Sequence, residues 1–217
     1  MTNTDLELEI LEGERDEIIN YFEKIIFPSD DVILNDPFSI NRFQEVDEIN
    51  SWKIYQPFFL KNEDKDYEIY KNQIDILNQN ELNIWKINQG IPSLINEIDY
   101  KNNPLELGLT DLIDFNKGCF LGQETMSKIK NVQSLKQEIR VWKSLNYFLN
   151  LESQNFNVYK NSSKEIIIGK ITRFHKTDSE IIGLAMVKRK YLKIKDPYYS
   201  EIFGEITLKQ SIGSNFL

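Results

Sequence analysis

One residue of this sequence, Cys119, is suited to nucleophilic or redox chemistry, and it lies in the stretch KGCFLGQE at residues 117–124. Glycines stand one residue before it and three after it, so the backbone there can adopt a positive φ or approach a neighbouring group closely. Lys117, together with a helix expected to begin just after the cysteine, favours the thiolate form. The alternative is a small buried apolar residue, which the spacing alone favours for a lone cysteine.

Two segments upstream of Cys119 complete a longer pattern. NIWKINQGIP at residues 83–92 is followed by PLELGL at residues 104–109, and IDFN at residues 113–116 leads directly into KGCFLGQE. In this order the segments resemble the YgfZ family of folate-binding proteins, relatives of the glycine-cleavage T-protein (aminomethyltransferase). The hallmark of that family is a K-G-C-[FY]-x-G-Q-E motif, and this chain matches every fixed position. The resemblance covers most of the chain and is strongest between Trp85 and Lys130.

The resemblance implies a function and a set of residues for it. A relative of this family is expected to bind tetrahydrofolate and to act through Cys119, with Lys117 beside it, in the assembly or repair of iron–sulfur clusters. Cys119 would contact a cluster transiently or act as a redox thiol, since one thiolate cannot retain a cluster alone. The remaining residues of the motif loop are Gly118, Phe120, Gly122, Gln123 and Glu124.

Two other functions remain open at this stage. One is a folate-dependent one-carbon transferase like the T-protein, although the transferases do not place a cysteine in this motif. The other is a non-catalytic interaction module, or a shortened remnant of the same fold. For Glu124 the sequence favours a structural role, capping the amides of its own turn, over catalysis.

The resemblance assigns the folate site to Trp85, Lys86, Asn88 and Glu106. Relatives carry an arginine and often a glutamate where this chain has Lys86 and Asn88. Lysine lacks the planar fork that suits a carboxylate, and asparagine is neither an acid nor a base, so we expect weakened folate binding. Each residue also has a plain structural interpretation: helix core for Trp85, and a solvated side chain for Lys86 and Glu106.

Composition restricts the class of protein. The chain has 217 residues, of which 41% are hydrophobic and 28% charged, values typical of a soluble globular protein. One cysteine excludes an internal disulfide and a multi-cysteine metal site, and no resident metal is expected. The net charge of −8 argues against contact with nucleic acid phosphates. Without an apolar run of membrane-spanning length or a signal peptide, we expect a cytoplasmic monomer whose partners are folate and iron–sulfur proteins or their assembly machinery.

Hydrophobic periodicity predicts the elements of the first 130 residues. Residues 6–10 alternate as in a half-buried strand, and an amphipathic helix follows Gly13, with Pro28 preventing its continuation. Further strands are expected at residues 31–35, 52–60 and 112–115, and one or two helices between residues 74 and 87, ending at Gly90. Relatives carry an additional N-terminal stretch with strands and a folate-facing aspartate. Its absence from this sequence implies either a misplaced start codon or a naturally shortened form.

Short β-rich runs follow residue 130, at residues 139–142, 156–159, 166–172, 181–187 and 204–208. Their spacing predicts a small barrel or sandwich, in which Gly169 and Gly183 mark bulges or close strand approaches. The basic cluster at residues 188–195 is either a solvated barrel rim or a phosphate or polyglutamate site. His175 is expected in a loop, without metal partners.

The predicted fold class is therefore α+β. A folate-binding, aminomethyltransferase-like domain, N-terminally shortened, is expected at residues 1–130, and a small β-barrel domain is expected at residues 131–217. The motivation is the change from helical to strand periodicity near residue 130.

Overall fold

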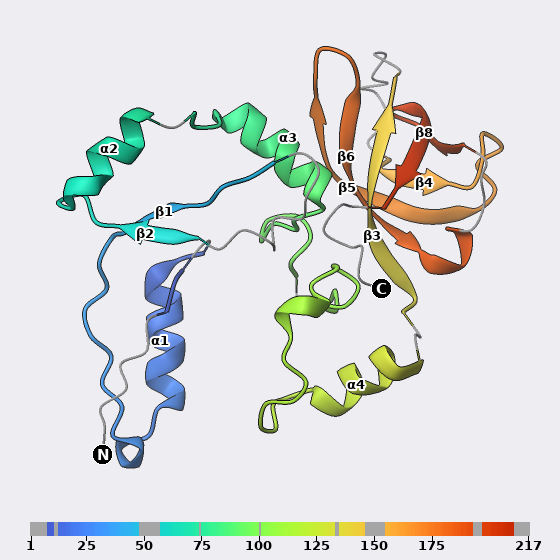
Figure 1. Cartoon of the computed structure of the whole chain (residues 1–217). Helices are drawn as coiled ribbons and strands as arrows, with labels where there is room; N and C mark the ends of the chain where they lie inside the picture. The colour runs from blue at the N-terminus through green and yellow to red at the C-terminus, as the bar shows by residue number, and fades with distance from the viewer. Residues whose placement is uncertain are drawn as a thin grey trace. The chain divides into compact units, whose positions relative to one another are not determined.

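The structure is a computed structural model that describes residues 8–10, 13–47, 57–73, 75–99, 101–132, 135–145, 155–192 and 197–210. The chain divides into two compact units, Met1–Ile40 and Asn41–Leu217. Helices and strands are mixed, and the second unit contains a closed six-stranded barrel (Figure 1). The α+β class and the small barrel agree with the sequence. The aminomethyltransferase-like character of the residues before the barrel and the domain boundary at residue 130 stay predictions.

In the residues of the first unit that the structure describes, an α-helix, α1 (Arg15–Ile25), is followed by a short 3-10 helix, η1 (Pro28–Asp30). Acidic side chains in the first turn and a lysine in the last turn of α1 suit its helix dipole. The amide of Phe27 donates to the Asp30 carboxylate over 2.8 Å, which closes the turn that follows the helix. The predicted helix after Gly13 is thus confirmed. It ends at Ile25, and Pro28, which was expected to prevent its continuation, is the first residue of η1.

Two predicted strands of this unit are wrong in the residues that the structure describes. Residues 31–35 are irregular and exposed, and Asp31 adopts a left-handed backbone (φ 53°) that interrupts an extended segment. Residues 8–10 are also irregular, while residues 6 and 7 lie outside the described part of the chain. An alternating sequence forms a strand only where a neighbouring strand pairs with its backbone groups, and sequence alternation does not supply that partner.

The second unit begins with a small antiparallel sheet and two helices. Strand β1 (Asn41–Phe43) pairs with β2 (Phe58–Leu60), and the rings of Phe43 and Phe58 stack with centroids 5.3 Å apart. The expected strand at residues 52–60 is therefore present at its end, and residues 51–56 lie outside the described part. Helix α2 (Lys65–Gln73) was missed, because its residues are mostly polar and show no clear apolar face.

Helix α3 (Gln79–Gln89) has well-formed ends. The Asn78 side chain accepts from the amides of Asn80 and Glu81, while the Glu81 carboxylate accepts from the Asn78 amide, a capping box. At the other end Gly90 takes a left-handed conformation with φ 70°. This conformation is unfavourable for residues with a Cβ, which explains a glycine at this position. The predicted helix ending at Gly90 is confirmed.

The barrel is antiparallel throughout, with strand order β3-β6-β5-β4-β7-β8. Its strands are β3 (Gln137–Ser144), β4 (Asn157–Tyr159), β5 (Ile167–Lys176), β6 (Ile181–Lys188), β7 (Tyr198–Ser200) and β8 (Gly204–Lys209). Five of the six were predicted; β7, with the sequence Tyr-Tyr-Ser, was missed because it shows no alternation of apolar and polar residues. His175 lies within β5 and not in a loop, since β5 continues beyond the predicted end at residue 172.

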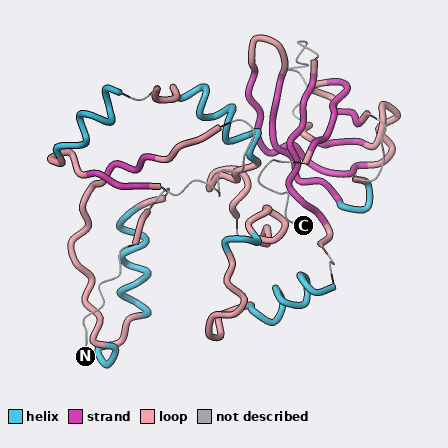
Figure 2. Tube along the Cα trace, in the orientation of Figure 1, coloured by secondary structure: helices cyan, strands magenta, loops and turns pink. Residues whose placement is uncertain are grey.

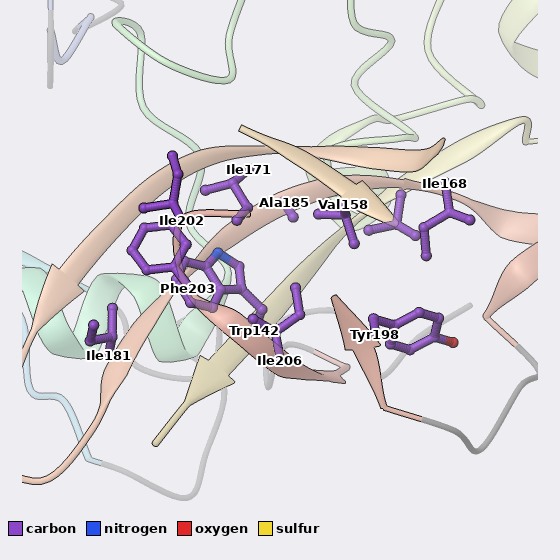
Figure 3. Close-up of a cluster of buried hydrophobic side chains, with 11 residues drawn as sticks. Trp142, Val158, Ile168, Ile171, Ile181, Ala185, Tyr198, Ile202, Phe203 and Ile206 are labelled. Atoms are coloured by element: carbon purple, nitrogen blue, oxygen red, sulfur yellow. The ribbon is translucent and has the colours of Figure 1, made fainter. Parts of the chain in front are cut away.

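Side chains from all six strands and from the β7–β8 turn fill the barrel (Figure 3). The Trp142 and Phe203 rings pack with centroids 4.6 Å apart, and the Trp142 indole N–H donates to the Leu184 carbonyl over 3.2 Å. A buried Trp is stable only when its N–H has an acceptor, which this hydrogen bond supplies.

A second apolar cluster covers the outside of β3 and β6. Ile87 of α3 and Leu107 of the following turns pack against outward-facing side chains of these strands, which are Ile139, Val141, Ile182, Leu184 and Met186. This cover explains why residues 181–187 of β6 are buried without alternation. Figure 2 shows the loop region that follows α3, and Leu107 of this region belongs to the cover.

The two predicted glycine positions are confirmed as close strand approaches. A Cβ on Gly183 would lie 2.2 Å from the Arg173 carbonyl oxygen and 2.5 Å from Trp142 Nε1, and one on Gly169 would lie 2.3 Å from the Met186 carbonyl oxygen. These distances are shorter than any van der Waals contact, so a larger residue must displace backbone or the Trp142 ring.

We predict that Gly183→Ala lowers the free energy of unfolding by about 1–3 kcal/mol, the usual cost of overpacking a core. Gly118→Ala is the matched control, because a Cβ there meets nothing within 4 Å and its effect should stay within about 0.5 kcal/mol. Urea unfolding of the two variants measures both values. Equal stability of the variants would contradict the close packing at Gly183.

Candidate functional site

The candidate site is the Cys119 loop, residues 115–122, which leads into helix α4 (Gln123–Val132). The strand expected at residues 112–115 is wrong, because Leu112 ends a 3-10 helix, η2 (Thr110–Leu112), and the next residues turn. The Asp114 carboxylate accepts from the Asn116 amide over 2.8 Å, a local turn that competes with extended structure. The helix predicted after the motif is confirmed.

The side chain of Gln123 closes the Cys119 loop. Its Oε1 accepts from the Phe120 amide over 3.3 Å, and its Nε2 donates to the Phe115 carbonyl over 3.3 Å. The Gln123 amide also donates to the Phe120 carbonyl over 3.1 Å. One carboxamide therefore joins both ends of the loop, a task that requires a donor and an acceptor on the same side chain. This role explains a glutamine at this position.

Cys119 is a free, exposed cysteine on this loop. An exposed side chain does not fit the alternative of a buried apolar residue. Of the two glycines around it, Gly122 has φ +84° and so requires glycine, whereas Gly118 has open space where a Cβ would lie. Leu121, two residues after it on the loop, is fully exposed.

Two lysines lie over aromatic rings of the loop. Lys117 Nζ is 5.0 Å from the centroid of the Phe120 ring, and Lys130 Nζ of α4 is 4.1 Å from that of Phe115. Each cation is attracted to the negative face of its ring. The two lysines bring positive charge to both sides of the loop that carries Cys119.

The Glu124 carboxylate pairs along the helix and does not cap its own turn. Its carboxylate pairs with Lys128 Nζ at 2.9 Å, one helical turn later, with both side chains mostly exposed. Such a pair contributes roughly 0.3–0.5 kcal/mol to helix stability. The capping role predicted for Glu124 is taken by the neighbouring Gln123.

The residues assigned to folate lie on α3 and after it. The indole N–H of Trp85 donates to the Asp47 carbonyl over 2.8 Å, and the Trp85, Lys86 and Asn88 side chains are all partly exposed. The Glu106 carboxylate accepts from the Asn103 amide and from Gln137 Nε2 of β3, each over 3.3 Å. Glu106 therefore contacts the start of the barrel, and its carbonyl also accepts from the Ile139 amide over 2.9 Å.

Sequence reasoning missed a buried polar contact between the segment after α3 and strand β5. Glu97 is fully buried, and its carboxylate accepts from Thr172 Oγ1 at 2.6 Å and from the Ser93 amide at 2.9 Å. Arg173 Nη2 lies 3.9 Å from the same carboxylate and donates to the Ile91 carbonyl over 2.6 Å. Nothing in the sequence around Glu97 indicates that its side chain is buried. The available signal was the pair of adjacent polar residues in the middle of β5, Thr172 and Arg173.

A second missed cluster contains Glu138 and Arg140 of β3 and Arg189. The Glu138 carboxylate pairs with Arg140, and with Arg189 at 3.4 Å. Burial lowers the pKa of Arg140 from its usual value, and the charge of Arg189 lowers it further. Of the basic cluster predicted near residue 190, Lys188 Nζ donates to the Ile167 carbonyl, and Lys193 and Lys195 lie outside the described residues.

In the part of the chain that the structure describes, no three His, Cys, Asp or Glu side chains come together in a way that could bind a metal ion. In the same residues, every helix is too short or too polar to cross a membrane.

Comparison with known proteins gives one informative relative. No protein-family model matches this chain. The chain is 32% identical over 111 residues to a chloroplastic protein of Arabidopsis thaliana that carries the name "Putative transferase". The match covers 50% of this chain and 24% of that relative, so the chain spans about a quarter of the relative's length. The name is consistent with a T-protein-like transferase family, and membership of the YgfZ family stays a prediction.

We predict that Cys119 is alkylated by iodoacetamide at comparable rates in the native and the urea-unfolded chain, because the thiol is exposed. A thiol that reacts only after unfolding would contradict this geometry.

Gln123→Ala removes two loop hydrogen bonds worth about 1 kcal/mol each, so exchange of the Phe120 amide should accelerate about fivefold or more. Glu124→Gln is the control and should leave that exchange unchanged.

Proposed function

We propose that this protein is a tetrahydrofolate-binding accessory factor of the YgfZ type, which acts through Cys119 in the assembly or repair of iron–sulfur clusters. The observation that carries the proposal is the exposed Cys119 on a loop closed by Gln123, within a complete K-G-C-F-x-G-Q-E motif. The transferase name of the Arabidopsis relative supports a place among proteins related to the T-protein. The cytoplasm is the proposed location.

The chemistry proposed for Cys119 is reversible metal coordination. The thiol gives its proton to water, and the thiolate donates an electron pair to an iron of a client cluster, without electron transfer. A single thiolate releases the cluster readily, since stable clusters take several cysteine ligands. Exposure of Cys119 is what a contact with a large client protein requires.

Tetrahydrofolate is proposed to bind beside α3. The donor set suits this ligand: Lys86 for the glutamate carboxylate, the Asn88 amide for the edge of the pterin, and the Trp85 ring for stacking. All three side chains are partly exposed and so available to a ligand. Glu106 is proposed to support this region through its contact with Gln137.

A folate-dependent one-carbon transferase is the second candidate, and the name of the Arabidopsis relative favours it. In a transferase, folate is a reactant and the cysteine is dispensable. A non-catalytic interaction module would need neither Cys119 nor Lys86. The three functions therefore differ in which of these two residues they require.

We predict that Cys119→Ser, expressed in cells lacking the native gene, fails to restore the activity of iron–sulfur enzymes. Serine keeps the size and a hydroxyl but has little affinity for iron compared with a thiolate. Leu121→Ser is the matched control on the same loop and should restore activity fully, because Leu121 is exposed and has no metal chemistry. Lys86→Ala should restore it only in part.

Other outcomes separate the alternatives. Full restoration by Cys119→Ser with failure of Lys86→Ala would favour the one-carbon transferase. Full restoration by both variants would favour the interaction module and contradict the proposed role of the thiol.

A further inference from the structure

Alternate side chains of β3 point into the barrel, and near the start of this strand they are charged. Trp142 belongs to the core inside the barrel, whereas Ile139 and Val141 belong to the cluster outside it (Figure 3). Successive side chains of a strand point to opposite faces, so Glu138 and Arg140 lie on the same face as Trp142. The interior of the barrel is therefore apolar around Trp142 and ionic toward the end at which β3 begins.

The carboxylate of Glu138 is shared between two guanidinium groups at this end. One is that of Arg140, and the other is that of Arg189, whose Nε lies 3.4 Å from Glu138 Oε2. Arg189 begins the 3-10 helix η3 (Arg189–Tyr191), and its amide donates to the Lys136 carbonyl over 3.0 Å. The two arginines are thus held on adjoining segments, with one carboxylate between them.

Arg140 has a donor that its surroundings do not use. Its Nε is buried and has no hydrogen-bond acceptor in the part of the chain that the structure describes. Nearly all buried N–H groups in folded proteins have an acceptor, so this one is suited to donate to a bound anion. The charge of Arg140 is also incompletely balanced, because Glu138 pairs with Arg189 as well. Burial lowers the pKa of Arg140, and the charge of Arg189 lowers it further, which agrees with this imbalance.

Arg173 of β5 provides a comparison within the same barrel. Its side chain is 19% exposed, like that of Arg140, and its Nε is also buried without an acceptor. Its Nη2, however, donates to the Ile91 carbonyl and lies 3.9 Å from Glu97, a carboxylate that pairs with no second cation among the described residues. The combination of an unused donor and a shared counter-charge distinguishes Arg140.

We propose that this end of the barrel binds a small oxyanion, a carboxylate or a phosphate group, which accepts hydrogen bonds from the Arg140 guanidinium and is attracted by the charge of Arg189. The planar guanidinium suits both groups, since each presents two oxygens to its parallel N–H bonds. The mouths of β-barrels are a common place for ligand sites. The site uses neither Cys119 nor the residues beside α3, so it does not rest on the function proposed above.

The test follows the Nε–H signals of Arg140 and Arg173 in the full chain by NMR. Sodium phosphate and sodium acetate are added in separate titrations at constant ionic strength, with sodium chloride as the reference salt. We expect at least one of the two anions to shift the Arg140 signal saturably, with a dissociation constant of about 10 mM or tighter. The Arg173 signal should keep its position. Saturation by one anion alone assigns the site to that group, and saturation by both assigns it to the oxyanion chemistry that they share.

A variant tests the planar guanidinium separately from its charge. Arg140→Lys keeps the positive charge but loses the fork of N–H donors, so the anion should bind about tenfold more weakly, as followed at the Arg189 amide. Arg15→Lys makes the same exchange on α1, where the side chain is 61% exposed, and should bind like the parent chain. Circular dichroism reports whether each variant folds, and the titration of the parent chain decides the proposal even where Arg140→Lys does not fold.

Three results would overturn the proposal. One is the lack of a saturable shift of the Arg140 signal with either anion, at concentrations about tenfold above the expected dissociation constant. Another is an equal shift of the Arg173 signal, because the effect would then be a general one of the salt. The third is equal binding by the parent chain and a folded Arg140→Lys variant.

Discussion

The buried carboxylate of Glu97 imposes the strongest constraint on the arrangement around the barrel. A carboxylate without water is stable only when hydrogen bonds and charge compensate its lost hydration, and Thr172, Ser93 and Arg173 provide them. Two of these partners belong to β5, and the third lies four residues before Glu97. The segment after α3 therefore has to lie against the barrel for the carboxylate to remain buried.

Apolar packing acts in the same direction. Ile87 and Leu107 lie on either side of Glu97 in sequence and cover the outer face of β3 and β6. Glu106 adds contacts to Gln137 at the start of β3. The position of α3, with Trp85, Lys86 and Asn88, thus depends on the barrel. The Cys119 loop depends instead on contacts among residues 115–130, which leave its thiol accessible.

Periodicity predicted the parts of the fold whose signals are local. Short β-rich runs separated by turns identified β3, β4, β5, β6 and β8, and Gly90 identified the end of α3. The predicted strands at residues 31–35 and 112–115 failed because aspartates there form left-handed or turn conformations, which an apolar count does not register. The close strand approaches at Gly169 and Gly183 were predictable because glycine is the residue without a Cβ, and a glycine inside a strand therefore indicates a close neighbour.

The candidate site was predictable to the same extent. The motif located the loop and its thiol, but a glutamine at position 123 carries no mark that its carboxamide joins Phe115 to Phe120. Glu97 could not be predicted, because Thr172 lies 75 residues away and pairing over such a distance depends on tertiary structure.

Native-state hydrogen exchange of the full chain tests the central claim that the segment after α3 belongs to the barrel. The amides of Glu97, Ile98 and Leu109 donate to backbone carbonyls within this segment, and the Ile91 amide donates to the Lys86 carbonyl of α3. The account predicts that they exchange with the same opening free energy as the amides of β3, β5 and β6, because they open only when the barrel unfolds. Exchange as fast as that of α4, with the barrel strands still protected, would contradict it.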